Sequence, residues 1–155
     1  MVTAFVLLLL AQRQRVATPA QPAGDWKIEI TTEGGITGTG TGGLSVSSDG
    51  TLVITLINKK PCAFHLTAEE LQTLNAAIGG THPMEWLECY SFADVMTQCC
   101  DLVRTTLRVT LPNRHVYVTS WLTGTPPFPA DLASLVDALR GPAGIDARYR
   151  PLCTP

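Results

Sequence analysis

The chain has little charge, and neither sign dominates it. Charged residues make up 15% of the 155 residues, and the formal net charge is -2. Proteins that bind nucleic acid or anionic membranes usually carry a basic stripe, whereas the 11 Lys and Arg residues here are scattered. Because hydrophobic residues reach 45%, we expect one globular domain with a real core. We exclude nucleic acid as its main partner.

Long apolar runs are also missing. No run after the N-terminus approaches the roughly 18 apolar residues that a membrane-spanning helix needs. Residues 4–11 form a purely apolar run that is too short to span, and Ala/Pro/Gln-rich residues follow it. This layout is typical of a secretory signal. We therefore expect residues 1–23 to be a signal peptide or a disordered segment, with cleavage between Ala17 and Ala23, and a secreted or periplasmic mature chain without a membrane span. The alternative is a cytosolic protein with an apolar N-terminus, since no positive charge precedes the run.

Recognisable catalytic and metal-binding motifs are absent. The sequence contains no Gly-x-Ser-x-Gly elbow. Cys62 and His65 have a spacing that zinc can use, but no second pair stands at a familiar separation. A catalytic pair of Cys100 and His115 is conceivable, although a disulfide cysteine and a surface histidine explain these two residues better. We expect no enzymatic activity, no cofactor and no metal.

Cysteine is frequent for so short a chain, which fits an oxidising compartment. The disulfide candidates are Cys62, Cys89, Cys99, Cys100 and Cys153. Their odd number leaves one thiol unpaired. Adjacent Cys99 and Cys100 would point to opposite sides of an extended segment. They should therefore find different partners, or only one of them finds any, and Cys62 and Cys89 are the nearest candidates. Cys153 could hold the C-terminal tail, and the connectivity stays open.

The stretch GGITGTGTGG, residues 34–43, is the most unusual part of the sequence. A phosphate-binding loop would need a lysine and a helix after it, but the next residues look like a strand. A slack linker is disfavoured because threonine favours extended structure. We expect Gly34 and Gly35 to permit a bend between two strands. Gly38, Gly40 and Gly42 should then line one bare side of a strand.

Period-two alternation elsewhere predicts antiparallel strands, joined by hairpins at Asp49–Gly50 and at residues 112–114. The predicted strands cover residues 26–31, 44–47, 51–57, 102–111 and 115–122. Trp26 should fill the core. Trp121 could instead be an anchor on an exposed face, because it lies opposite Val116 and Val118.

Two helices are predicted. Thr67 and Glu70 form a capping box with a hydrophobic staple around it, and Gly79–Gly80 should end this helix in a left-handed cap. The second helix presents an apolar stripe and stops at Gly141–Pro142. Its stripe consists of Leu132, Leu135, Val136 and Leu139. The order of elements implies an α+β domain over residues 25–141, an antiparallel sheet with two helices on one face. Residues 142–155 should be a loose tail unless Cys153 fixes them.

The sequence resembles one family over about residues 26–141. TTEGGITGTG, after a short strand and before an Asp-Gly hairpin, is similar to the Arg-Ser-Gly-Gly-Phe-x-Gly opening of emfourin-like proteins, small bacterial inhibitors of thermolysin-type metalloproteases. The Leu-Thr-x-x-Glu-Leu helix, the Cys-Cys-Asp segment before a hairpin and the Pro-x-x-Leu-x-x-Leu helix continue the similarity. Gly34, Gly35 and Gly38 match, whereas Thr32-Glu33 replaces Arg-Ser and Ile36 replaces the aromatic residue. The resemblance implies a scaffold whose loops occlude a protease cleft, without chemistry of its own.

We therefore expect an exported, non-enzymatic domain that binds another protein, with inhibition of a thermolysin-like metalloprotease as its specific form. The expected partner-binding residues are Gly34, Gly35, Ile36, Thr37, Gly38 and Trp121. One alternative is a structural or ligand-sequestering envelope domain, which a cavity lined by Trp86, Tyr90 and Phe92 would favour. Another is a redox protein with a reactive thiol among the cysteines at positions 89, 99 and 100.

Overall fold

Strands and helices alternate in blocks along the chain, and the strands join into one sheet. The computed structural model describes residues 24–35, 38, 40–90, 102–123 and 128–153. The strands in this part are β1 (Lys27–Gly34), β2 (Gly43–Ser47), β3 (Thr51–Thr55), β4 (Cys62–His65), β5 (Cys89–Tyr90), β6 (Val103–Thr110) and β7 (Val116–Leu122). The helices are α1 (Ala68–Gly79), α2 (Ala130–Arg140) and α3 (Ile145–Tyr149), with short 3₁₀ turns η1 (Pro83–Glu85) and η3 (Arg150–Cys153).

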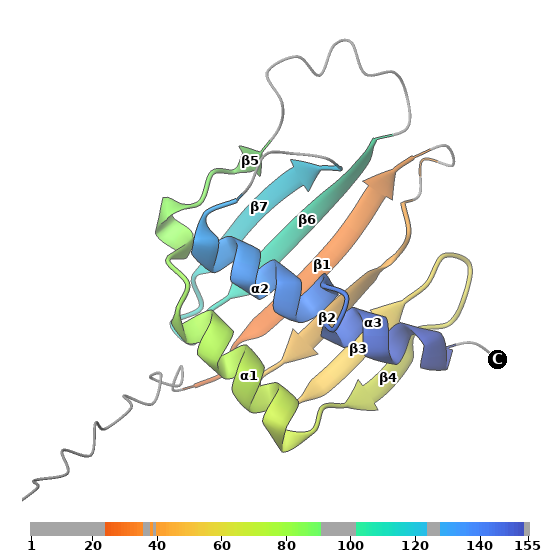
Figure 1. The fold of residues 1–155 in the computed structure, drawn as a ribbon, viewed down its shortest axis with the longest axis horizontal. Coiled ribbons are helices and arrows are strands. Elements are labelled where there is room, and N and C mark those ends of the chain that lie inside the picture. The colour runs from red at the N-terminus through yellow and green to blue at the C-terminus, as the bar shows by residue number, and fades with distance from the viewer. Residues whose placement is uncertain (1–23, 36–37, 39, 91–101, 124–127, 154–155) are drawn as a thin grey trace, which may run out of the picture.

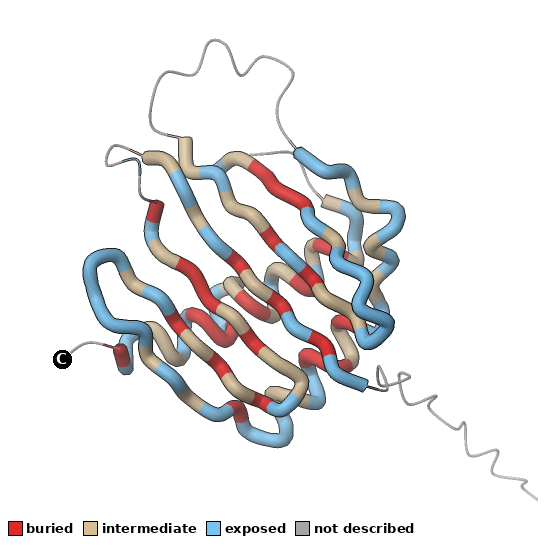
Figure 2. The backbone as a smooth tube through the Cα atoms, turned by 180° about the vertical axis from the view of Figure 1, so that it is seen from behind, coloured by how far each residue is buried: buried red, intermediate tan, exposed pale blue. Residues whose placement is uncertain are grey.

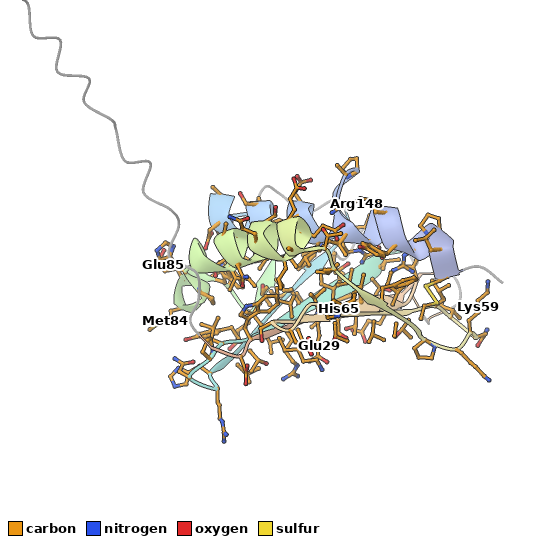
Figure 3. The ribbon with its side chains drawn as sticks, turned by 90° about the horizontal axis from the view of Figure 1, so that it is seen from below. Glu29, Lys59, His65, Met84, Glu85 and Arg148 are labelled. Carbon is orange, nitrogen blue, oxygen red and sulfur yellow. A yellow bond between two sulfur atoms is a disulfide. The ribbon has the colours of Figure 1, made fainter. Side chains whose placement is uncertain are left out.

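The sheet has the strand order β4-β3-β2-β1-β6-β7-β5. Every neighbouring pair is antiparallel except β5 and β7, which are parallel. The α-helices all lie across one face of the sheet (Figure 1). Seen along the sheet, the helices form one layer and the strands the other (Figure 3). The predicted α+β architecture is confirmed, with α3 as an additional short helix.

The core lies between the sheet and the helices. Ile28 and Ile30 of β1 pair with Val46 and Leu44 of β2, and all four side chains are buried. The apolar stripe of α2 packs in the same core, because its residues recur at helical spacing and so face one side of the helix. Its residues Leu132, Leu135 and Leu139 are fully buried. Each such side chain stabilises the fold by about 1.5–3 kcal/mol through burial.

Trp26 belongs to this core, as predicted. Its side chain is buried, and the indole Nε1–H donates a hydrogen bond to Oδ1 of Asn75 on α1, 2.8 Å away. Asn75 is itself buried. The two polar groups satisfy each other, which offsets the desolvation that either would suffer alone.

The opposite face of the sheet is open. Figure 2 shows this face, where exposed and half-buried residues alternate with the buried ones that point toward the helices. Glu29 points away from the helix layer, on the other side of the sheet from Arg148 (Figure 3). The Lys27 ammonium pairs with Glu29 at 2.8 Å, and Val116 and Val118 are exposed. This one-sided covering explains why the strands alternate apolar and polar residues.

Helix α1 begins as predicted and ends differently. The Thr67 hydroxyl accepts a hydrogen bond from the backbone N–H of Glu70, and the Glu70 carboxylate accepts one from the backbone N–H of Thr67. At the other end Gly80 has φ -90°, so the predicted left-handed cap is wrong. The N–H of Gly80 instead donates to the carbonyls of Ala76 and Ala77, and this tightened last turn satisfies the helix end without a positive φ.

The C-terminal segment is folded, not loose. Residues 145–153 form α3 and η3, where Ile145 and Cys153 are buried. A disulfide joins Cys153 to Cys62 on β4, which confirms that Cys153 fixes the tail and identifies its partner. The domain therefore extends past residue 141 to at least Cys153. Strand β4, which this disulfide reaches, was not predicted, because its four residues are too short to show an alternation.

Candidate functional site

Three strands end at the same edge of the sheet. Gly34, at the end of β1, pairs with Val103 at the start of β6, and β7 and β5 also end here, where Trp121 pairs with Tyr90. We call this edge the loop end of the sheet; it is the upper edge in Figure 1. The connection from β1 to β2 lies at this loop end, and the chain also leaves β5 and β7 here. Residues that join rigid strands at one end are a common place for binding sites.

The glycine-rich segment is a loop at this end, not a strand. β1 ends at Gly34 and β2 begins at Gly43, so the prediction that Gly38, Gly40 and Gly42 line a strand is wrong. The reason is their backbone: φ is 72° at Gly38, 68° at Gly40 and 92° at Gly42. Such positive φ values do not fit the interior of an extended strand and strongly favour glycine. Gly34 and Gly35, with φ 89° and 73°, make the predicted bend.

Hydrogen bonds connect the described residues of this loop, which we call the glycine loop (residues 34, 35, 38 and 40–43). The N–H of Gly34 donates to the carbonyl of Gly38 at 3.1 Å, and the N–H of Gly38 donates to the carbonyl of Gly35 at 2.9 Å. The N–H of Gly40 donates to the carbonyl of Gly34 at 2.9 Å. These backbone groups are therefore satisfied within the loop itself.

Side chains from outside the loop fasten it further. The Thr32 hydroxyl donates to the carbonyl of Gly42 and accepts from the N–H of Thr41, each at 2.7 Å. From the C-terminal segment, Nη1 of Arg150 donates to the carbonyl of Thr41 at 3.2 Å. The glycine loop is therefore tied both to β1 and to η3, over 100 residues further along the chain.

A pocket of about 350 Å³ lies beside the glycine loop. We call it the threonine pocket; its lining residues are Thr32, Thr41, Val103, Thr105, Trp121, Thr123, Val136 and Arg140. Strands β1, β6 and β7 supply residues of the helix-facing side, Thr41 comes from the glycine loop, and α2 supplies Val136 and Arg140. The pocket therefore forms where α2 leaves the loop end of the sheet uncovered.

A charged cluster borders this pocket. The carboxylate of Asp146 lies between two arginines, with Oδ2 at 3.5 Å from Nε of Arg140 and Oδ1 at 2.9 Å from Nε of Arg150. Asp146 is buried, although it is charged. Buried charges persist when they are paired and hydrogen-bonded. With two guanidinium groups for one carboxylate, the cluster carries one excess positive charge.

Trp121 lies on the helix-facing side, so the prediction that it stands exposed is wrong. It is 9% exposed, and its ring packs against that of Phe128 with centroids 5.0 Å apart. The ring of Tyr90 contacts the same phenylalanine at 5.5 Å. The prediction erred because it took the face of Val116 and Val118 to be the inner one. The helices cover the other face.

Aromatic residues near β5 are held by a hydrogen-bonded carboxylate. Asp131 on α2 accepts from the indole Nε1–H of Trp86 at 3.0 Å and from the backbone N–H of His82 at 2.8 Å. Burial raises the pKa of Asp131, but these hydrogen bonds outweigh burial and leave that pKa below its ordinary value. Trp86 and Tyr90 are half-buried against the core. Phe92, expected with them in a cavity, lies outside the described residues.

The structure brings together some of the expected partner-binding residues. Gly34, Gly35 and Gly38 belong to the glycine loop, and Trp121 lines the pocket beside it. Ile36 and Thr37 lie outside the described residues. Sequence reasoning missed Thr32 and Arg150. Thr32 could have been found, because it continues the inward-facing series of Ile28 and Ile30; nothing in the sequence connects Arg150 with the loop.

The described cysteines are a disulfide pair and one exposed thiol. Cys89 is exposed and makes no disulfide with another described residue, and Cys99 and Cys100 lie outside the described part. Cys62 is used in a disulfide, which removes it from the Cys62–His65 pair. Among the described residues, no three His, Cys, Asp or Glu side chains gather as a metal site would require. In the same part of the chain, no helix has the length and apolar character to cross a membrane.

A second pocket, of about 300 Å³, lies between α1 and α3. Glu70 lines it and is bound by Nη1 of Arg148 at 2.7 Å and by the hydroxyl of Tyr149 at 2.8 Å. Burial raises the pKa of Glu70, but the hydrogen bonds from Thr67 and Tyr149 and the charge of Arg148 outweigh it, so that pKa is lowered. Because capping and tail contacts already use this carboxylate, we assign it a structural role.

Comparisons with protein-family models, with curated proteins and with solved structures found no match. No relative therefore lends its function to this chain, and the resemblance to emfourin-like inhibitors stays a prediction.

Proposed function

We propose that this chain is an exported, non-enzymatic domain that binds another protein through the loop end of its sheet. The observation that carries the proposal is the glycine loop, whose described residues are held by backbone hydrogen bonds, by Thr32 and by Arg150. Six glycines in ten residues would make a free chain very flexible. The conformational entropy of these glycines is therefore lost when the domain folds, so binding a partner does not have to order them again.

A preordered loop binds more tightly than a flexible one of the same composition, because association does not have to immobilise it. Inhibitory loops that occupy an enzyme cleft depend on this effect. Gly38 is exposed, and a Cβ atom built on it would meet nothing within 4 Å. Gly38 itself is thus open to an approaching surface.

Export is the second part of the proposal. The Cys62–Cys153 disulfide fits an oxidising compartment, and the apolar run at residues 4–11 followed by Ala/Pro-rich residues has the layout of a secretory signal. Expression of the full chain in a bacterial host, followed by mass spectrometry of the periplasmic protein, tests this part. We expect a mature N-terminus between Ala17 and Ala23; recovery of the uncleaved chain in the cytosol would contradict export.

The specific form of the proposal is inhibition of a thermolysin-type metalloprotease. The purified mature domain is titrated against thermolysin at concentrations up to roughly 10 μM, which detects inhibition constants in the usual micromolar range. We expect loss of peptidase turnover and a complex on size-exclusion chromatography. Unchanged turnover together with no complex would refute the inhibitor form.

Two arginine substitutions locate the binding surface. Gly38→Arg places a bulky charge at the open point of the glycine loop, whereas Ser45→Arg places the same charge on the open sheet face. We expect the loop substitution to weaken binding by about tenfold or more and the sheet substitution to leave it unchanged. The reverse ranking would move the interface to the open face of the sheet.

A further inference from the structure

We propose that the threonine pocket binds a carboxylate carried on a short apolar stem. This inference does not depend on the protein-binding proposal, because the ligand can be a free small acid. The same carboxylate chemistry also occurs on an acidic side chain, and the two sources are distinguished below.

The charge around the pocket favours one negative group. Arg140 lines the pocket and shares Asp146 with Arg150. Asp146 balances only one of these two arginines. Arg150 also has a buried Nη2 that lacks a hydrogen-bond partner within the described part of the chain. A monoanion near Arg140 would complete the neutralisation of the cluster.

Guanidinium chemistry favours a carboxylate as that anion. The planar fork of arginine matches two carboxylate oxygens and forms stronger hydrogen bonds to them than to neutral acceptors. Arg140 contacts Asp146 through Nε. No acidic side chain is among the residues that line the pocket, so a cationic ligand would meet Arg140 without compensation.

The other walls suit a short apolar stem. Trp121, Val103 and Val136 supply apolar surface, and threonine methyl groups add to it. Three of the hydroxyls are already used. Thr32 donates to the carbonyl of Gly42, Thr123 donates to the carbonyl of Val103, and the hydroxyls of Thr41 and Thr32 bond to each other. A volume of about 350 Å³ is at the lower end of the range for small-molecule sites. These walls therefore fit a small acid better than a large polar ligand.

The test uses the folded mature domain labelled with ¹⁵N. Butyrate is titrated while the Trp121 indole N–H signal, assigned through Trp121→Phe, and the Thr41 amide signal are followed by NMR. We expect both signals to shift and to saturate with a dissociation constant of roughly 1–10 mM, as a ligand of this size allows. Butyramide, which has the same shape without the charge, should shift them at least about tenfold more weakly. Equal shifts with the amide, or no saturable shift with butyrate, would overturn the proposal.

Substitutions identify the residue that holds the carboxylate. Arg140→Gln should abolish saturation, whereas Arg148→Gln, which removes the same charge next to the second pocket, should not. Because Arg140→Gln also disturbs Asp146 and could unfold the domain, Val136→Phe provides a second variant that fills the pocket and leaves the charges in place. Loss of butyrate binding in Val136→Phe supports the pocket, and unchanged binding in either pocket variant overturns it.

A further titration distinguishes the two sources of the carboxylate. N-acetyl-glutamate N-methylamide presents the same group on a peptide side chain, with the glutamine analogue as its uncharged control. Binding of butyrate alone assigns the pocket to free small acids. Binding of both acids extends it to acidic side chains of a partner, and binding of neither refutes the proposal whatever the outcome of the protease experiment.

Discussion

The conformation of the glycine loop yields a prediction that separates backbone strain from steric overlap. Gly38 and Gly40 have nearly the same positive φ, 72° and 68°. A Cβ atom at Gly38 would meet no atom within 4 Å, whereas one at Gly40 would overlap the backbone carbonyl of Thr32. Alanine at Gly38 therefore reports on φ alone, and alanine at Gly40 reports on φ and overlap together.

The magnitudes follow from these two contributions. A left-handed backbone costs an L-residue roughly 1–2 kcal/mol, partly offset by about 0.4–1 kcal/mol because alanine restricts the unfolded chain. We expect Gly38→Ala to lower the free energy of unfolding by roughly 0–1.6 kcal/mol. Gly40→Ala must also displace the backbone of β1 at Thr32, and forced repacking of this kind adds about 1–3 kcal/mol.

Urea denaturation followed by far-UV circular dichroism measures both variants under identical conditions. The m-value should stay unchanged, which shows that the two variants unfold from comparable states. Gly38→Asn serves as a further control, because asparagine tolerates the left-handed region better than alanine. If Gly40→Ala lost no more stability than Gly38→Ala, within roughly 0.5 kcal/mol, the tight packing of the loop on β1 would be refuted.

Two further predictions concern the C-terminal segment and α1. Replacing Cys62 and Cys153 with alanine opens a loop across a sequence separation of 91 residues. The chain-entropy model then gives a loss of about 4–5 kcal/mol in the free energy of unfolding. A urea midpoint equal to that of the oxidised wild type would contradict this. Burial raises the pKa of Glu70, but hydrogen bonds outweigh burial and keep that pKa below the ordinary value. The ionised carboxylate therefore stabilises the fold above the unfolded-state pKa. This stabilisation is lost as the pH falls through the folded-state pKa. The stability difference between wild type and Glu70→Gln should therefore shrink from pH 7 to pH 3 (roughly the span of carboxyl titration), and a difference independent of pH would refute the role of the charge.

Local patterns predicted most of the fold. Ile28 and Ile30 identify the inner face of β1 because side chains alternate in a strand. Thr67 and Glu70 locate the start of α1 because a capping box needs only four neighbouring residues. The short strands β4 and β5 escaped prediction, since two to four residues cannot show a period, and they form by pairing with neighbours that are already in place.

The candidate site was predictable only in part. The glycine-rich composition marked residues 34–43 as unusual, but the same alternation of Thr and Gly fits a strand and a loop equally well. The choice depends on contacts from elsewhere: Thr32 from β1 and Arg150 from the C-terminal segment hold the loop. Trp121 was assigned to the wrong face, because alternation in β7 defines two faces without stating which one the helices cover.

The sequence by itself determined the fold class, the inward-facing residues of β1 and the limits of both long helices, because these depend on neighbours a few residues apart. The tertiary structure alone decided that Thr32 and Arg150 hold the end of the glycine loop at Thr41 and Gly42, that Cys62 joins Cys153, and that Arg140, Asp146 and Arg150 meet beside the threonine pocket. These features join residues far apart in the chain. Their geometry is fixed only when the helices pack on the sheet, since that packing sets the distances between side chains.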